Sequence, residues 1–183
     1  MSYLVWKARK SPPMIRDLVE RARAGDTAAF DLLVDRSLEP FMRLATAIMI
    51  DRDLARDVVQ DSLVLVWQHL PELRDDGAFD AWAKRIVINT ARNTLRAARR
   101  VRAIPTWTPS DPLEGAADRI ALEAALRGLD AEHRVVLALF YLEDQSVAAI
   151  GRLLRIPEGT VKSRLHSGRA KLRTAFEDDD GRT

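Results

Sequence analysis

Apolar residues recur along most of this chain at the spacing of an α-helix, and no segment alternates apolar and polar residues convincingly as a β-strand does. The first predicted helix covers residues 14–24. Gly25 followed by Asp26 is typical of a helix end followed by the N-cap of the next helix. The second helix then has a broad apolar face. This face consists of Phe30, Leu33, Val34, Leu38, Phe41, Leu44, Ala45 and Ile48.

Two more helices follow in the first half of the chain. Asp51 is the predicted N-cap of the third helix, and Pro71 ends it. The predicted buried positions of this helix are Leu54, Val58, Leu65, Val66 and Leu70. A polar loop over residues 72–77 leads to a fourth helix, over about residues 78–102. These four helices predict a small domain that must use most of its apolar residues as core.

The pattern changes after the fourth helix. Residues 104–115 read I-P-T-W-T-P-S-D-P-L-E-G, with three prolines and no helical spacing, which indicates an extended linker. Beyond the linker, helices are predicted over 117–128, 131–142 (with Asp130 as N-cap), 147–154 and 157–176. We therefore expect an all-α fold of two small helical domains. The expected divisions are a leader (1–13), the first domain (14–102), the linker (103–116), the second domain (117–176) and an acidic tail (177–183).

The last predicted helix suits DNA recognition. Residues 156–173 read I-P-E-G-T-V-K-S-R-L-H-S-G-R-A-K-L-R, in which Val161, Leu165, Gly168 and Leu172 form one inward stripe and the rest is mostly polar or basic. The short helix before it lies across a tight turn, so the pair predicts a helix-turn-helix whose second helix can enter a DNA major groove. An amphipathic surface helix with a solvated basic face is the plainer interpretation.

Composition narrows the function classes. The chain has 183 residues, of which 47% are hydrophobic and 31% charged, as in an ordinary soluble protein. It has no cysteine, which excludes a disulfide framework, a thiolate zinc finger and a catalytic thiol, and fits a reducing cytosol. No apolar run approaches the length of a membrane span, and the apolar run in the leader is too short for a signal peptide.

Positive charge is concentrated in two segments although the net charge is only +2. Residues 81–103 contain seven basic residues and no acidic one, and residues 145–176 contain seven basic residues and one acid, Glu158. Attraction to phosphates depends on such local charge rather than on the total. The chain therefore has two candidate surfaces for nucleic acid.

The first of these surfaces is a stripe on the fourth helix. Arg85, Asn89, Arg92 and Arg96 follow one another at i, i+4, i+7 and i+11, and no acid interleaves to form the ion pairs of an ordinary charged face. Arginines near exposed aromatic rings such as Trp82 suit single-stranded DNA, where cations hold phosphates and rings or pockets receive unstacked bases. Alternatively, Phe79 and Trp82 belong to the core and the arginines form a solvated face; for Phe79 we favour the core.

The quoted motifs resemble those of the extracytoplasmic-function sigma factors, the smallest class of the sigma-70 family. W-A-K-R-I-V-I-N-T-A-R-N resembles their region 2, and D-R-D-L-A-R-D-V-V-Q-D-S with V-W-Q-H-L resembles their polymerase-binding helix. L-D-A-E-H-R-V-V-L-A-L-F-Y-L-E-D-Q-S, followed by I-P-E-G-T-V-K-S-R-L, resembles their region 4. The resemblance covers about residues 14–102 and 118–176, with the motifs in the family's order.

The resemblance implies a sigma factor that binds core bacterial RNA polymerase in the cytoplasm and recognises the −10 and −35 promoter elements. It implies contacts with the polymerase flap and, through Asp57, Gln60 and Asp61, with the clamp helices of the largest subunit. Melting of the −10 element and capture of a flipped base map to the loop 72–78 and to Trp82, Lys84, Arg85, Asn89, Arg92, Asn93 and Arg96. Recognition of the −35 duplex maps to Thr160, Lys162, Ser163, Arg164, His166, Ser167 and Arg169. The linker is expected to run toward the polymerase active centre.

Three positions depart from the family's pattern. Ala149 replaces a common glutamate that would complete a capping box with Ser146, at a cost of about 0.5–1 kcal/mol. Ser167 and Gly168 replace a frequent Arg-Ala, so the −35 preference of relatives does not transfer. Only an acidic tail follows Phe176, which makes a separate anti-sigma factor the expected regulator.

Two other function classes compete with a sigma factor. A free-standing dimeric helix-turn-helix regulator accounts for residues 130–176 but not for the arginine stripe or the linker. An enzyme on nucleic acid is disfavoured because the basic surfaces carry no carboxylate cluster for metal-dependent hydrolysis. His69, His133 and His166 lie on different predicted helices without ligand spacing. We expect no catalytic activity, no cofactor and no metal.

Overall fold

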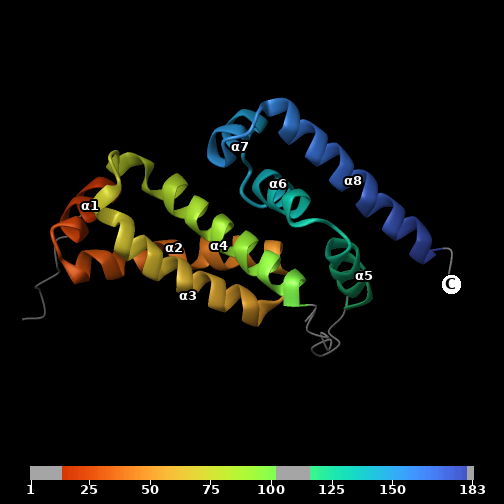
Figure 1. Ribbon diagram of the computed structural model, residues 1–183, viewed down its shortest axis with the longest axis horizontal. Coiled ribbons are helices and arrows are strands. Elements are labelled where there is room, and N and C mark those ends of the chain that lie inside the picture. Colours follow the sequence, from red (N-terminus) through yellow and green to blue (C-terminus); the bar gives the residue numbers. More distant parts are fainter. Residues whose placement is uncertain (1–13, 102–115, 181–183) are drawn as a thin grey trace, which may run out of the picture.

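The computed structural model describes residues 14–101 and 116–180, and within these ranges the chain is all-α, as predicted (Figure 1). The first half contains α1 (Ile15–Arg23), α2 (Thr27–Met49), α3 (Arg52–His69) and α4 (Phe79–Val101). Short 3-10 turns at Leu70–Glu72 and Asp76–Ala78 join α3 to α4. The second half contains α5 (Ala116–Arg127), α6 (Ala131–Tyr141), α7 (Val147–Leu154) and α8 (Glu158–Asp180). The predicted linker lies outside the described residues, apart from its last position, which belongs to α5.

Local sequence signals explain where the helices of the first half begin. The Asp26 carboxylate accepts a hydrogen bond from the Ala29 amide at 3.1 Å, and the Asp51 carboxylate accepts from Leu54 at 2.9 Å. Both side chains satisfy amides that the first helical turn leaves unpaired, so both predicted N-caps are confirmed. Gly25 has a φ of 95°, which permits the tight turn between α1 and α2.

The core of the first half lies between α2, α3 and α4. Phe41, Leu44, Val58, Phe79 and Ile88 are among its buried side chains. Most of the predicted apolar face of α2 is buried, but the prediction for Leu38 is wrong, because this side chain is 43% exposed. The buried stripe passes through positions 29, 33, 37 and 41, so Ser37 occupies the inward position and Leu38 lies one residue off it. Leu54 and Leu65, also predicted as buried, are half-buried.

The second half contains the predicted helix-turn-helix. Arg155 has left-handed backbone angles (φ 56°, ψ 47°) and ends α7, and the Ile156 amide donates to the Gly151 carbonyl at 3.0 Å. Val161 and Leu165 are buried against α6 and α7, which confirms the inward stripe of α8. Gly168 belongs to the same stripe, where an added Cβ would lie 3.0 Å from Leu137 Cδ1 of α6.

Asp130 is the N-cap residue of α6, as predicted, although its carboxylate makes no capping hydrogen bond and lies 3.4 Å from Lys171 Nζ of α8. The predicted end of the last helix is wrong. Residues 177–180, expected to be a tail, continue α8 to Asp180.

The two halves pack directly against each other along α2, α4, α6 and α7, an arrangement that the linker alone did not predict (Figure 1). Arg134 of α6 is 6% exposed and donates from Nε to the Ile48 carbonyl of α2 at 2.6 Å. Arg127 of α5 donates to the Ile50 carbonyl at 3.2 Å. These carbonyls at the C-terminus of α2 lack partners within their own helix, so the second half satisfies acceptors of the first. None of the described helices is both long and apolar enough to cross a membrane.

Candidate nucleic-acid interface

The predicted stripe on α4 exists as one face of that helix. The opposite face carries Ala83, Val87, Ile88 and Ala91, which are buried in the first half and fix the helix in position. Asn89, Asn93 and Arg96 are exposed. The structure therefore brings the predicted −10 residues of α4 together and orients them by the burial of the opposite face.

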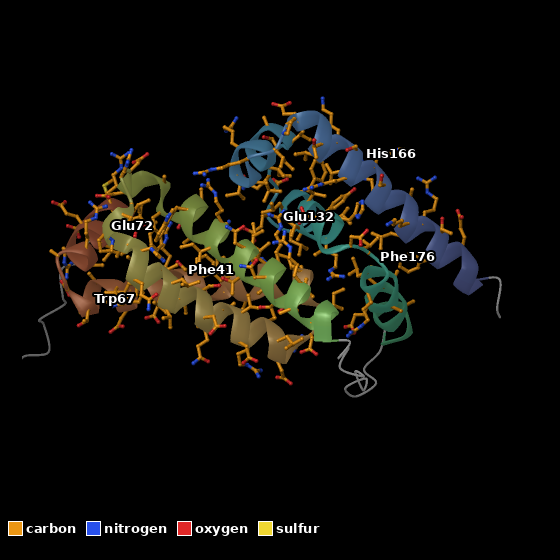
Figure 2. The ribbon with its side chains drawn as sticks, viewed as in Figure 1. Phe41, Trp67, Glu72, Glu132, His166 and Phe176 are labelled. Carbon is orange, nitrogen blue, oxygen red and sulfur yellow. The ribbon has the colours of Figure 1, made fainter. Side chains whose placement is uncertain are left out.

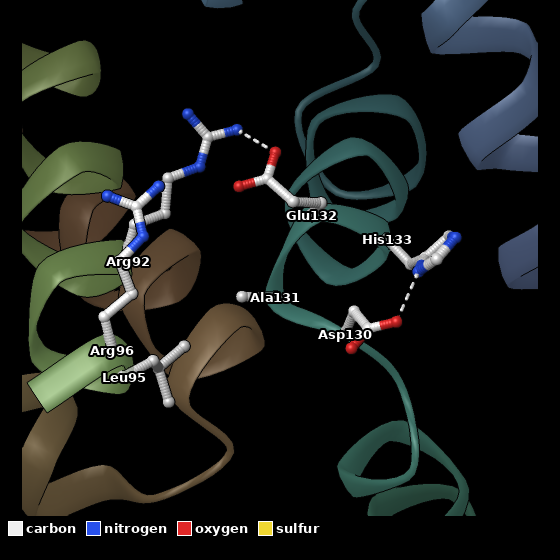
Figure 3. Close-up of a pocket in the computed structure, with 7 residues that line it drawn as sticks. All are labelled: Arg92, Leu95, Arg96, Asp130, Ala131, Glu132 and His133. Atoms are coloured by element: carbon white, nitrogen blue, oxygen red, sulfur yellow. Dashed lines mark hydrogen bonds and ion pairs between the residues drawn. The ribbon is translucent and has the colours of Figure 1, made fainter. Parts of the chain in front are cut away.

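Two arginines of this stripe and the neighbouring Lys84 contact the second half of the chain. Lys84 forms an ion pair with Glu143, and Arg85 donates from Nε to the Leu153 carbonyl of α7 at 2.9 Å. Arg92 donates to Glu132 Oε2 of α6 at 2.8 Å, beside a pocket of about 350 Å³ (Figure 3). Burial lowers the pKa of Arg92, and the carboxylate of Glu132 offsets part of that effect. These cations are not arranged as a freely solvated face.

The aromatic side chains next to the stripe differ in burial. Phe79 is 1% exposed, which confirms that it belongs to the core. Trp82 is half-buried, with its ring centroid 6.1 Å from that of Phe79. The predicted polar loop before them is folded as 3-10 turns, held by an ion pair between Arg23 and Asp76 and by the Arg23 hydrogen bond to the Leu73 carbonyl at 2.7 Å. Trp82 thus keeps a partly open position beside an ordered loop.

The second predicted surface, on α8, is more accessible. Lys162, Ser163 and His166 are exposed, and Figure 2 shows His166 on α8 and Glu132 between the two halves. Arg169 is exposed as well, donates to the Tyr141 hydroxyl at 2.8 Å and lies 5.3 Å from the Phe140 ring centroid. Thr160, Arg164 and Ser167 are half-buried.

Glu132 connects the two basic surfaces. Its Oε2 atom lies 2.8 Å from Arg92 of α4 and 2.7 Å from Arg164 of α8. One carboxylate oxygen therefore pairs with a predicted −10 residue and with a predicted −35 residue. Sequence reasoning did not identify Glu132, because a single glutamate in the first turn of a helix has an ordinary local explanation.

Glu143 is a second carboxylate that joins the halves. Its side chain is 4% exposed, lies 3.0 Å from Arg43 of α2 and also pairs with Lys84 of α4. Burial acts to raise the pKa of Glu143, but the hydrogen bonds from Lys84 and Arg43 outweigh burial, so the pKa lies below its ordinary value. Glu143 is therefore held as a buried anion between two cations of the first half.

The predicted polymerase-binding residues share one exposed face of α3. Asp57, Gln60 and Asp61 point to solvent, and Val64 and Trp67 extend the surface with exposed fractions of 51% and 39%. Trp67 packs edge-on against Phe30, with ring centroids 4.7 Å apart. Large apolar side chains beside exposed acids suit a protein-protein contact. Neither Val64 nor Trp67 is among the buried positions predicted for this helix.

The second half carries an apolar groove of about 560 Å³, lined by residues of α5, α6 and α8 and by Ala47 of α2. Leu122, Tyr141 and Leu142 in its lining are 41%, 58% and 48% exposed. Apolar residues this exposed are typical of contact sites for another protein. Within the described ranges, no group of three or more histidine or acidic side chains is placed to hold a metal ion.

Comparison with known proteins places both halves in one family. The family model for Sigma-70 region 2 matches residues 33–101, and that for Sigma-70, region 4 matches residues 119–172. The ECF RNA polymerase sigma factor SigL of Mycobacterium tuberculosis is 34% identical over 87% of this chain and 96% of its own length. The RNA polymerase sigma-H factor of Pseudomonas aeruginosa is 32% identical over 88% of this chain and 93% of its own.

Solved structures agree with these sequence matches. CnrH in complex with the cytosolic domain of CnrY superposes with a TM-score of 0.68 and is 27% identical, over 90% of this chain and 97% of CnrH. The sigma factor RpoE in complex with the anti-sigma factor NepR from Bartonella quintana has the same TM-score at 23% identity, over 81% of this chain and 96% of RpoE. The second likeness supports the fold alone.

Proposed function

This chain belongs to the extracytoplasmic-function subfamily of the sigma-70 family, and we propose which of its surfaces bind DNA and which bind RNA polymerase. The chain is a sigma factor that directs promoter-specific transcription initiation by RNA polymerase. The observation that carries the proposal is that one chain has two basic helical surfaces, each on a half that matches a different sigma region. A free-standing regulator that uses only the helix-turn-helix leaves the first half without a role.

The α4 surface is proposed to bind the single strand of the −10 element. Lys84, Arg85, Arg92 and Arg96 supply cations for phosphates, while Asn89 and Asn93 offer paired donors and acceptors to a base edge. Trp82 and the folded loop before it lie at the N-terminal end of this surface. A flipped base there must offset lost stacking, which is worth a few kcal/mol. The exposed asparagines and the partly open Trp82 support this role.

The α8 surface is proposed to read the −35 element as duplex. Lys162, Ser163, His166 and Arg169 are exposed along the helix that follows the turn, with Thr160, Arg164 and Ser167 beside them. A helix with this exposed polar face can lie in the major groove while Val161 and Leu165 anchor it to α6 and α7. The sequence preference is assigned to His166 and Ser167.

Core RNA polymerase is the proposed protein partner. The α3 face of Asp57, Gln60 and Asp61 is assigned to the clamp helices of the largest subunit, and exposed Trp67 supplies an apolar contact beside it. The groove between α5, α6 and α8 is assigned to the polymerase flap, because its lining is apolar and open. The proposed sigma regions are residues 14–102 and 117–176.

We further infer that the protein acts in the bacterial cytoplasm and has no catalytic activity of its own. A separate anti-sigma factor is its proposed regulator. The solved relative CnrH is complexed with another protein, the cytosolic domain of CnrY, which supports regulation by a second chain.

Run-off transcription tests the proposed function. The purified chain is added to bacterial core RNA polymerase with genomic fragments as templates, and core polymerase alone is the control. We expect discrete transcripts that depend on the added chain, together with co-purification of the chain with core polymerase. A chain that binds DNA but neither joins core polymerase nor starts transcripts would instead be a free-standing regulator.

A further inference from the structure

The apolar groove of the second half lies beside an exposed aromatic side chain of α8. Phe176, towards the C-terminal end of this helix, is 40% exposed and follows the groove-lining residues Leu172 and Arg173 at helical spacing (Figure 2). It therefore extends the face of α8 that lines the groove. We propose that a second copy of this chain covers this face, with Phe176 of each copy entering the groove of the other.

The groove exposes large apolar side chains to water. Leu122 of α5 and Tyr141 and Leu142 at the end of α6 surround a cavity of about 560 Å³, and each of them is more than a third exposed. Apolar side chains that are exposed together in this way mark contact sites for another protein. A second copy that covers them and its own Phe176 removes four large apolar side chains per chain from water, which stabilises the contact.

A two-fold axis allows one set of residues to serve both copies. In a closed dimer of identical chains the same surface meets itself, so every contact occurs twice. Two antiparallel α8 helices meet this condition when Phe176 of one copy lies over Leu172 of the other. Each groove then receives one aromatic ring, and neither groove stays open for the addition of further chains.

Charge complementarity favours the antiparallel arrangement. Arg173 follows Leu172 and Glu177 follows Phe176, so the register that joins the two apolar residues also brings Glu177 of one copy beside Arg173 of the other. Both charged side chains are exposed, and neither has an ion-pair partner within the ranges that the structure describes. Parallel helices would instead bring each of these charges level with the same charge of the second copy, which repulsion disfavours.

The dimer covers the groove that is assigned to the polymerase flap. Two free chains and one polymerase therefore compete for the same apolar surface, and binding to polymerase separates the two copies. A small interface binds weakly, so the polymerase can displace the second copy without a further factor. This consequence rests on the proposed function, whereas the dimer itself does not.

The first experiment measures the mass of the full chain by sedimentation equilibrium, over loading concentrations of about 1–200 μM. We expect an equilibrium between monomer and dimer for the parent chain. Phe176→Ser should raise the dissociation constant of the dimer by about tenfold or more, because each dimer loses two buried aromatic rings. The matched control Leu38→Ser removes a large apolar side chain that is 43% exposed on α2, and it should leave the equilibrium unchanged.

Charge reversal gives the sharper test, because a second reversal can compensate for the first. Glu177→Arg and Arg173→Glu should each raise the dissociation constant by about tenfold, since every dimer then contains two like-charge contacts. The double variant R173E/E177R restores opposite charges and should dimerise as the parent chain does. A mixture of the two single variants should form a mixed dimer for the same reason. The controls Asp35→Arg and Arg36→Glu reverse the same charges at exposed positions of α2 and should have no effect.

A parent chain that stays monomeric over the whole concentration range overturns the dimer. The same holds for a dimer that the single reversals leave unchanged or that R173E/E177R fails to restore, because such a dimer uses another surface. Run-off transcription with core polymerase separates these results from the proposed function. Transcription by a chain that never dimerises removes the dimer alone. A dimer that responds to both reversals but supports no transcription removes the proposed function and leaves the interface standing.

Discussion

The two basic surfaces of this molecule are both built on 23-residue helices, but their cations are in different environments. On α4, Lys84 and Arg92 have side chains that are 21% and 14% exposed and pair with acids of the other half. On α8, Lys162 and Arg169 are exposed. A similar density of positive charge can therefore produce a covered surface or an available one, and the covered surface is the one proposed for single-stranded DNA.

We expect the strongest effect from substitutions that remove the proposed single-strand contacts on α4. The double variant R85A/N89A should slow formation of the open promoter complex by about 100-fold, because it removes a phosphate contact and a base contact that together offset a few kcal/mol of lost stacking. Permanganate reactivity of unpaired thymines measures opening. The variant should still co-purify with core polymerase, since neither residue lies on the α3 face. Loss of polymerase binding would mean that α4 has a different role.

A second substitution destabilises the helix-turn-helix that carries the α8 surface and leaves the α4 surface unchanged. In Gly151→Ala the added Cβ would lie 3.1 Å from the backbone carbonyl oxygen of Ile156, so the turn between α7 and α8 must shift. We expect a loss of about 1–3 kcal/mol in local stability, as for other overpacked sites. Hydrogen exchange should become faster in α7 and α8 and stay unchanged in α2 and α3.

Gly159→Ala is the matched control for this variant. Gly159 lies in the first turn of α8, and an added Cβ there has no neighbour within 4 Å. Alanine is a better helix former than glycine by about 1 kcal/mol, so this variant should be neutral or more stable. Equal destabilisation by both variants would show that crowding at the turn is not the cause.

The sequence predicted best what neighbouring residues determine. The caps at Asp26 and Asp51 and the inward stripe of Val161 and Leu165 depend on contacts within one helix or on helical spacing, so they are confirmed. Leu38 was wrong because the exact line of a buried stripe depends on which helices cover it. Its neighbour Ser37 is polar, so the sequence did not predict that this side chain is buried.

The site was predicted in its parts but not in its assembly. Helical spacing alone predicted that Arg85, Asn89, Arg92 and Arg96 share one face of α4, and they do so in the structure. Glu132 pairs with Arg92 across 40 positions of sequence, and Glu143 pairs with Lys84 across 59. Contacts at that separation depend on how the two halves pack. A proline-rich linker is compatible with many arrangements, so it could not predict this one.

A substitution with a smaller expected effect tests whether the exposed cations of α8 contact phosphates. With core polymerase bound, Lys162→Ala should weaken binding to −35 duplex by about threefold to tenfold and lower the slope of log affinity against log salt by about one. Arg164→Ala should have less effect, because the Arg164 side chain is half-buried and pairs with Glu132 of the same half. An unchanged salt slope in Lys162→Ala would remove that residue from the DNA interface.

The weakest effect is expected from a substitution that stabilises the start of α7 and changes none of the proposed DNA-binding residues of α8. Ser146 Oγ accepts a hydrogen bond from the Ala149 amide at 3.2 Å, so half of a capping box already exists at the start of α7. Ala149→Glu supplies the side chain that can accept from the Ser146 amide, and adds a negative charge in the first turn, where the helix dipole favours it. We expect a gain of about 0.5–1 kcal/mol, measured by hydrogen exchange in α7. Ala149→Gln, which can form the same hydrogen bond without the charge, separates the two contributions. If neither variant slows exchange, the start of α7 is already satisfied by Ser146 alone.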